Sequence, residues 1–168
     1  RMHDGAAYNP HIAMLLGILG IRYPDKSHSV GQWLAVLRAA KKRVKKPTDA
    51  DVIIQELYAK KPGDMARYAT YIRPDVAVVS AITPEYMDVF GSIDEAAKEE
   101  LSITGFAKLT LINRDDIDAR FSDFVLTPQF STYGTSGLAE YHFEVDDFVP
   151  EDGFSGRVVA PEFPNGFR

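Results

Sequence analysis

The sequence has 168 residues, of which 45 % are hydrophobic and 26 % charged, and this suffices for one soluble domain with a hydrophobic core. Its net charge of −5 gives no basic excess to neutralise phosphates, so we expect no nucleic-acid partner. The lack of cysteine excludes disulfides and thiolate metal sites and fits a cytoplasmic location. Because no apolar stretch is as long as a membrane span, no membrane insertion is expected.

Two helices are predicted in the first third of the chain. Asn9 and Pro10 suit the cap and the first position of a helix that ends near Gly20. A second helix ends at Pro47, and its basic end at residues 41–46 suits the helix dipole and is interpreted as solvated. The apolar stripe of this second helix consists of Val30, Trp33, Leu34, Leu37 and Val44.

Three short apolar runs predict strands. Residues 52–54 and 76–79 suit strands that are buried on both faces, and residues 109–112 form a third strand. Pro62 opens a helix after the first run, and Ser92 with Glu95 forms a capping box that begins another helix after the second. Strands that alternate with helices predict an α/β fold, a three-layer αβα arrangement of P-loop or Rossmann-like type with a mostly parallel sheet.

From about residue 123 the pattern changes to short strands separated by glycine, proline and aspartate. Strands are predicted at residues 124–126, 130–133, 140–145 and 157–159. We expect one domain, with an α/β part at residues 1–122 and a small antiparallel β portion at residues 123–168. The sequence lacks a recognisable natural start and stop, and we expect it to be a fragment of a longer protein.

Polar residues follow each of the three predicted strands, in the places where open parallel sheets bind ligands. Glu56 follows the first strand, residues 80–88 follow the second, and Asn113 to Asp116 follow the third. Their oxygen atoms suit magnesium and phosphates, although any loop contains such residues. The pattern predicts that Glu56 and Asp116 face one shared crevice.

Several phrases of the sequence resemble the central domain of the Mur ligases, over about residues 7–116. They are AAYNPHIAMLLGILGI, QELYAKKPGDM, IRPDVAVV, ITPEYMDVFGS and LINRDD, and the Phe90-Gly91-Ser92 phrase is the most specific. The closest resemblance is to the branch that adds D-alanyl-D-alanine to a UDP-MurNAc-peptide. The tail from Phe130 resembles the small β-excursion of this family more loosely.

The resemblance implies an ATP- and Mg²⁺-dependent amide ligase of peptidoglycan biosynthesis in the cytoplasm. ATP would convert a carboxylate of a nucleotide-sugar peptide precursor to an acyl phosphate, and the amine of an amino acid or dipeptide would displace the phosphate. By position, the resemblance implies Glu56 as a magnesium ligand and Asn113 and Asp116 near the nucleotide. It also implies Asn9 near the entrance to the site.

The sequence departs from the family pattern at the phosphate and metal sites. The phosphate-binding motif G-x-x-x-x-G-K-[ST], which the family places before the region where this chain begins, is absent, so we expect the fragment itself to be inactive. Tyr86 stands where the family has a magnesium-binding histidine. Glu100 stands where the family has a carbamylated lysine and offers the same pair of oxygens on a shorter arm.

Plainer interpretations remain open for individual residues. Glu56 suits a solvated loop, Glu100 a charged helix face, Asn113 the cap of a turn, and His142 the surface of a strand. Two other functions also remain open: a non-catalytic Mur-like binding or scaffold domain, which Tyr86 favours, and a ligase that resembles folylpolyglutamate synthase.

Overall fold

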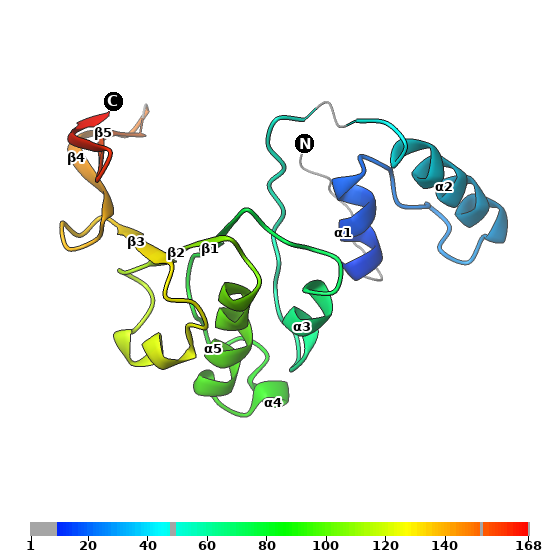
Figure 1. The fold of residues 1–168 in the computed structure, drawn as a ribbon, viewed down its shortest axis with the longest axis horizontal. Helices are drawn as coiled ribbons and strands as arrows, with labels where there is room; N and C mark the ends of the chain where they lie inside the picture. Colours follow the sequence, from blue (N-terminus) through cyan, green and yellow to red (C-terminus); the bar gives the residue numbers. More distant parts are fainter. Residues whose placement is uncertain (1–9, 48–49, 152, 168) are drawn as a thin grey trace. The chain divides into compact units, whose positions relative to one another are not determined.

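The computed structural model describes residues 10–47, 50–151 and 153–167 (Figure 1). The chain divides into two compact units, Arg1–Leu57 and Tyr58–Arg168. The first unit holds the helices α1 (Pro10–Ile18) and α2 (Val30–Arg43), and the second unit holds all six strands. No helix in the described ranges is both long and apolar enough to cross a membrane.

Both helices of the first unit begin and end close to the predicted positions. α1 starts at Pro10, and Gly20 follows it with φ at 68°, a left-handed conformation that suits the residue after a helix. Ser29 caps α2, because its Oγ accepts a hydrogen bond from the N–H of Gln32 at 3.3 Å. Asn9, the predicted cap of α1, lies outside the described residues.

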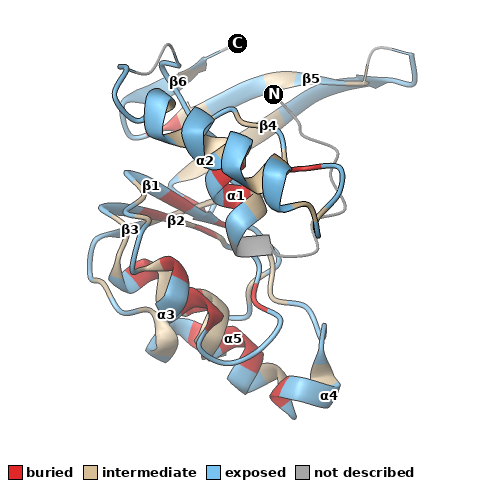
Figure 2. Cartoon of the chain, turned by 90° about the vertical axis from the view of Figure 1, so that its right-hand side faces the viewer, coloured by how far each residue is buried: buried red, intermediate tan, exposed pale blue. Residues whose placement is uncertain are grey.

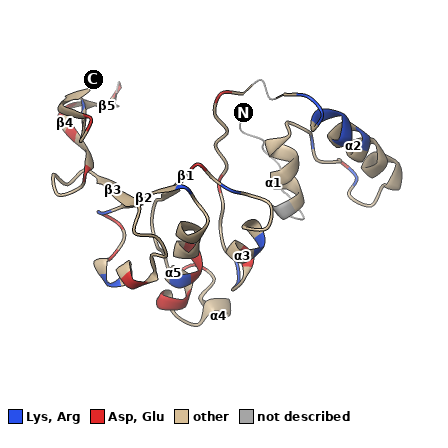
Figure 3. Ribbon diagram, viewed as in Figure 1, with Lys and Arg blue, Asp and Glu red and all other residues tan. Residues whose placement is uncertain are grey.

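The apolar stripe of α2 is not buried, contrary to the expectation for an amphipathic helix. None of its fourteen residues is buried, and Val30 is 73 % exposed. Trp33, a member of this stripe, is half-buried: its ring meets Tyr23 edge-on at 5.4 Å, and its indole N–H donates to the carbonyl of Ser27. Basic residues gather at the end of α2 (Figure 3), and its lysines are exposed, as predicted.

The predicted strand at residues 52–54 is wrong. The segment is irregular and belongs to none of the strand pairs of the described structure, and Ile54 is 93 % exposed. A β-branched run favours a strand only where a neighbouring strand satisfies its backbone N–H and C=O groups. The sheet begins at β1 instead, so Glu56 does not follow a strand.

The second unit contains a mixed six-stranded sheet whose strands lie in chain order. The strands are β1 (Val76–Val79), β2 (Leu109–Asn113), β3 (Phe130–Gly134), β4 (Tyr141–Val149), β5 (Gly153–Ala160) and β6 (Phe163–Phe167). The pairs from β1 to β4 are parallel, and β4–β5 and β5–β6 are antiparallel. The predicted α/β class, with a mostly parallel sheet and a small antiparallel portion, is confirmed.

The structure from residue 119 onward differs from the prediction in three places. β3, expected in the antiparallel portion, pairs in parallel with β2. The strand predicted at residues 124–126 is wrong, because the 3₁₀ helix η2 (Ala119–Phe124) ends there and its Phe121 and Phe124 stack at 6.1 Å. β6 was not predicted, since Pro164 and Gly166 interrupt its apolar pattern.

Helices of the second unit lie along one side of the parallel strands (Figures 1 and 2). They are α3 (Asp64–Tyr68), α4 (Met87–Phe90), α5 (Ile93–Leu101) and the 3₁₀ helix η1 (Ser102–Gly105). The buried core beneath β1 is formed by Val79, Ala97, Leu101 and Phe121. The predicted helix start is confirmed, because Ser92 Oγ accepts the N–H of Glu95 at the start of α5, which is one of the two hydrogen bonds of a capping box.

Burial alternates along β1, so this strand is buried on one face only. Ala77 and Val79 face the core, whereas Val76 and Val78 are 49 % and 58 % exposed. The expectation of burial on both faces is therefore wrong for β1. The physical reason is that the helices of this unit form a single layer on the side of Val79.

Glu99 fastens α3 to α5. Its two carboxylate oxygens accept the backbone N–H groups of Gly63 and Met65 at 2.9 and 2.8 Å. These N–H groups lie at the N-terminal end of α3, where a helix offers donors without partners inside the helix. The carboxylate thus orients a short helix that its own five residues would not hold in place.

Replacing Glu99 by alanine is expected to lower the free energy of unfolding by about 1–3 kcal/mol, because two N–H groups lose a charged acceptor. Urea denaturation followed by circular dichroism measures the change. Lys98→Ala, at the exposed neighbouring position, is the control and should stay within about 0.5 kcal/mol of the wild type. Equal losses in the two variants would contradict the role of Glu99.

Candidate functional site

The loop after β2 holds two of the predicted nucleotide-binding residues together. Asn113 Nδ2 donates to Asp116 Oδ2 at 2.8 Å, and Asn113 Oδ1 accepts the backbone N–H of Asp115 at 2.9 Å. The second bond is a side chain-to-backbone turn of the kind that asparagine favours. Asn113 therefore does cap its turn, while its contact with a nucleotide stays a prediction.

Tyr133 links the carboxyl ends of β1, β2 and β3. It is the second-last residue of β3 and lies opposite Asn113 in the register, and its hydroxyl donates to the carbonyl of Val79, the last residue of β1, at 3.5 Å. Burial, and secondarily the charge of Asp116, raises the pKa of Tyr133. The sequence analysis did not single out Tyr133, because its place beside Val79 depends on the pairing of strands far apart in sequence.

Asp115 lies within the predicted segment from Asn113 to Asp116, but the sequence analysis gave it no role of its own. Its Oδ2 accepts both the backbone N–H of Thr135, at 2.5 Å, and the hydroxyl of Thr135, at 2.8 Å. These two hydrogen bonds, together with one from the N–H of Ser136, lower the pKa of Asp115. An exposed carboxylate thus joins the loop after β2 to the loop after β3.

The region after β1 contains Tyr86 and Glu100, two of the predicted metal ligands. Burial, followed by the negative charge of the nearby Glu85, raises the pKa of Glu100 to about 7. Tyr86 adjoins Glu85 in the sequence and has φ at 52°, a left-handed conformation that is unfavourable for a side chain of this size. The ammonium group of Lys60 lies 5.9 Å from the centre of the Tyr86 ring.

The residues that the structure describes do not fit a site for magnesium and a triphosphate. Within the described ranges, no three histidine, aspartate or glutamate side chains come together as metal ligands. Glu56 is exposed and belongs to the first unit, whereas Asp116 belongs to the second, so their shared crevice stays a prediction. Asn9 lies outside the described residues. The sequence also lacks a phosphate-binding loop.

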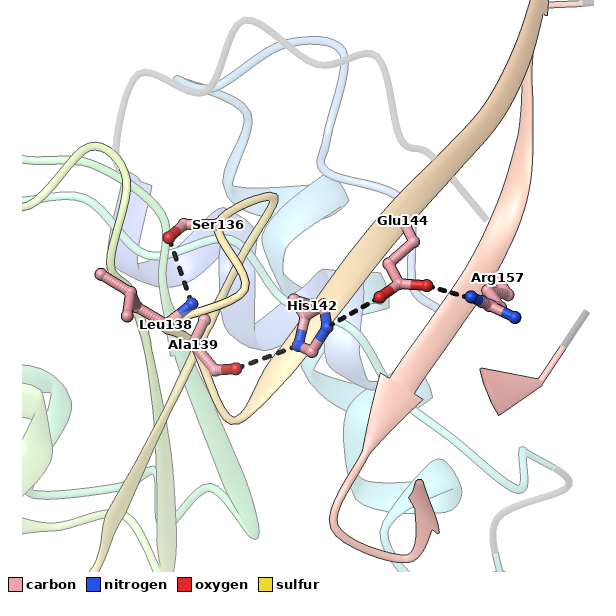
Figure 4. Close-up of polar contacts among 6 residues, drawn as sticks. All are labelled: Ser136, Leu138, Ala139, His142, Glu144 and Arg157. Carbon is pink, nitrogen blue, oxygen red and sulfur yellow. Dashed lines mark hydrogen bonds and ion pairs between the residues drawn. The ribbon is translucent and has the colours of Figure 1, made fainter. Parts of the chain in front are cut away.

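His142 occupies the base of the β4–β5 hairpin and is more enclosed than a surface residue (Figure 4). Its Nδ1 lies 3.1 Å from the carbonyl of Ala139, and its Nε2 lies 3.6 Å from Glu144 Oε1. Arg157 Nε donates to the other oxygen of Glu144 at 2.6 Å, and this bond is the main reason why the pKa of Glu144 is lowered. The cluster fastens the hairpin to the turn at residues 136–139.

Two hollows in the described surface involve other residues. One is formed by residues 25–29 of the first unit, and the other is a groove between α3, α5 and η2. Neither is lined by a residue predicted for the nucleotide or the metal. The loops at the carboxyl ends of β1, β2 and β3 therefore remain the candidate site, in agreement with the general position of ligands in open parallel sheets.

A sequence model of the Mur ligase middle domain matches residues 7–162. The chain belongs to this family, as the resemblance in its sequence implied. A curated relative, the UDP-N-acetylmuramate–L-alanine ligase of Myxococcus xanthus (strain DK1622), is 30 % identical over 93 residues, which cover 54 % of this chain and 19 % of that protein. The chain therefore spans only about a fifth of the curated relative.

Solved structures of MurF share the fold. MurF from Acinetobacter baumannii matches with a TM-score of 0.59 and 15 % identity, over 76 % of this chain and 28 % of that one. MurF from Thermotoga maritima, determined in complex with ADP, matches with a TM-score of 0.55 and 18 % identity, over 92 % of this chain and 35 % of that one. At these identities the likeness establishes the fold alone.

Proposed function

We propose that this chain is the part of an ATP-dependent amide ligase that receives the base and ribose of the nucleotide, at the loops after β2 and β3. The parent protein would join an amino acid or dipeptide to a carboxylate of a nucleotide-sugar peptide precursor. It would act in the cytoplasm, in peptidoglycan biosynthesis. A branch that adds D-alanyl-D-alanine is the best candidate, because the phrases of the sequence and the MurF fold both agree with it.

One observation supports the proposal above the others. Asn113 and Asp116 are hydrogen-bonded to each other at the carboxyl end of β2, and Tyr133 brings the end of β3 beside them. An amide and a carboxylate offer the donors and acceptors that recognise the edge of a base and the hydroxyls of a ribose. Membership of the Mur ligase family makes an adenine nucleotide the natural occupant.

The chemistry of the phosphates requires groups that this chain does not assemble. Magnesium and cationic side chains supply charge neutralisation when they are present, and the remaining work is positioning. The part played by the residues of this chain is to bind and orient one end of the nucleotide. We therefore expect the purified chain to bind nucleotide weakly and to leave ATP intact.

The proposal is tested by adding ATP with Mg²⁺, and separately ADP, to ¹⁵N-labelled protein. No phosphate should be released, and dissociation constants should be on the order of millimolar or weaker, because the phosphates find no partners. NMR shift changes should centre on the side-chain amide of Asn113 and the backbone of residues 114–117, and Asn113→Ala should remove the backbone changes. ATP turnover, tight ATP binding or shift changes centred on another loop would refute the proposal.

A non-catalytic binding or scaffold domain is the second candidate, and Tyr86 is the observation in its favour. A phenol is a poor magnesium ligand, and the backbone of Tyr86 has the left-handed conformation described above. The same titration separates the two functions. A scaffold domain would leave Asn113 unaffected by either nucleotide at any concentration that leaves the protein soluble.

A further inference from the structure

The hydrogen bonds of Asp115 form a continuous connection between two loops. Its carboxylate accepts from Thr135, twenty residues further along the chain, while its backbone N–H donates to Asn113 Oδ1. Asn113 in turn donates to Asp116. The backbone adds one more link, because the N–H of Arg114 donates to the carbonyl of Tyr133 at 2.8 Å. The orientation of Asn113 thus depends on where the loop after β3 lies.

Gly134 leaves room for this carboxylate. A Cβ at position 134 would lie 2.7 Å from Asp115 Oδ2 and 2.8 Å from its Cγ, distances at which the carboxylate would have to move. The lack of a side chain at Gly134, at the end of β3, therefore provides the space that the carboxylate of Asp115, after β2, occupies. A residue that only capped its own turn would need no such space on the neighbouring strand.

The loop after β3 is held from its far side as well. The carbonyl of Ala139 lies 3.1 Å from His142 Nδ1, and the N–H of Leu138 donates to Ser136 Oγ (Figure 4). The loop is thus a fixed anchor, supported by the base of the hairpin. A carboxylate attached to a fixed anchor can hold the rest of its own loop in one arrangement.

We propose that Asp115 is a positioning residue, which orients Asn113 and Asp116 for the nucleotide by tying the loop after β2 to Thr135. This inference rests on the proposed function and adds to it a residue that does not itself touch the ligand. All the described partners of the carboxylate are donors, so a carboxylate suits the position and an asparagine, whose amide group also donates, does not.

The first arm of the test uses no nucleotide. In Asp115→Asn, exchange of the Thr135 amide hydrogen should become about tenfold faster or more, because the charged acceptor is lost. The side-chain amide signals of Asn113 should shift as well. Asp118→Asn is the matched control, since Asp118 caps η2 in the same segment through Arg120 and carries the same charge. It should leave Asn113 and Thr135 unchanged.

The second arm adds ADP. Asp115→Asn should weaken the response of Asn113 to ADP roughly fivefold, because an unfixed side chain must be ordered on binding. Thr135→Val, which removes the hydroxyl donor but keeps the backbone N–H, should produce a smaller change in the same direction. This variant also keeps the test decisive if Asp115→Asn folds poorly.

The two arms separate the failure of this inference from that of the proposed function. If Asp115→Asn releases Thr135 but leaves Asn113 unchanged, Asp115 merely fastens the loop after β3, and the inference is wrong. If ADP leaves Asn113 of the wild type unchanged, the proposed function is wrong, while the first arm still decides whether Asp115 orients Asn113. The inference is supported if Asp115→Asn changes the NMR signals of Asn113 in both arms and Asp118→Asn does not.

Discussion

Replacing Leu101 by alanine is expected to lower the free energy of unfolding of the second unit by about 2–5 kcal/mol. Leu101 is 1 % exposed and packs in the cluster with Val79, Ala97 and Phe121 between α5 and the sheet. Alanine leaves a cavity that three neighbours on different elements cannot all close. Urea denaturation followed by circular dichroism measures the loss, since the single tryptophan belongs to the first unit.

Two further variants show whether the effect comes from burial. Leu101→Met conserves the volume and should cost about 1.5 kcal/mol or less, which keeps the test informative if the alanine variant does not fold. Leu138→Ala removes the same atoms from a side chain that is 74 % exposed, and should change stability by about 0.5 kcal/mol at most. A loss at Leu101 no larger than that at Leu138 would contradict the packing described here.

The second large effect is a dependence of stability on pH through Glu100. Its pKa in the folded protein is about 7, against an ordinary value of 4.5. Between these two pH values the folded state binds more protons than the unfolded state, so stability falls as pH rises from about 4.5 to about 7 and stays reduced above that range. The charged form is disfavoured by burial and by Glu85.

Glu100→Gln should therefore stabilise the protein at pH 8 and leave it nearly unchanged at pH 4.5. The full pKa shift of Glu100 would correspond to a larger gain in the free energy of unfolding. Because the side chain is only half-buried and partly screened by water, we expect a gain of about 1–2 kcal/mol at pH 8. Glu95→Gln, an exposed carboxylate of the same helix, is the control. The same gain at both pH values, or an equal gain in Glu95→Gln, would show that Glu100 is not the group responsible.

Local signals in the sequence predicted the elements whose cause is local. Ser92 caps α5, and Gly20 follows α1 in a left-handed conformation, each through interactions within a few residues. Strand pairing is not local, and the prediction failed there. Residues 52–54 have the composition of a buried strand, but composition does not provide a partner. The aromatic residues near position 124 likewise suit a strand or a 3₁₀ turn, and packing against α5 decides between them.

The candidate site likewise combines residues that are close in the sequence with residues that only strand pairing brings together. Asn113 and Asp116 are three residues apart, so their proximity at the end of a strand could be predicted. Asp115 with Thr135, and Tyr133 with Val79, meet only because β2 pairs with β3 and β1 in a particular register, which no spacing in the sequence reveals. The metal ligands Glu56, Tyr86 and Glu100 were carried over by position from a family resemblance, as was Asn9 at the site entrance. These predictions stay untested.

The exposure of α2 has an energetic consequence. A helix that buries none of its side chains gains little from tertiary packing, so its local stability depends on backbone hydrogen bonds, the Ser29 cap and the charges at its end. Such a helix opens and closes at little cost while the β-sheet and α5 stay intact, because their stability comes from a separate buried cluster. We therefore expect heat and denaturant to unfold α2 before the sheet and α5, so that a single melting temperature would describe only the second stage.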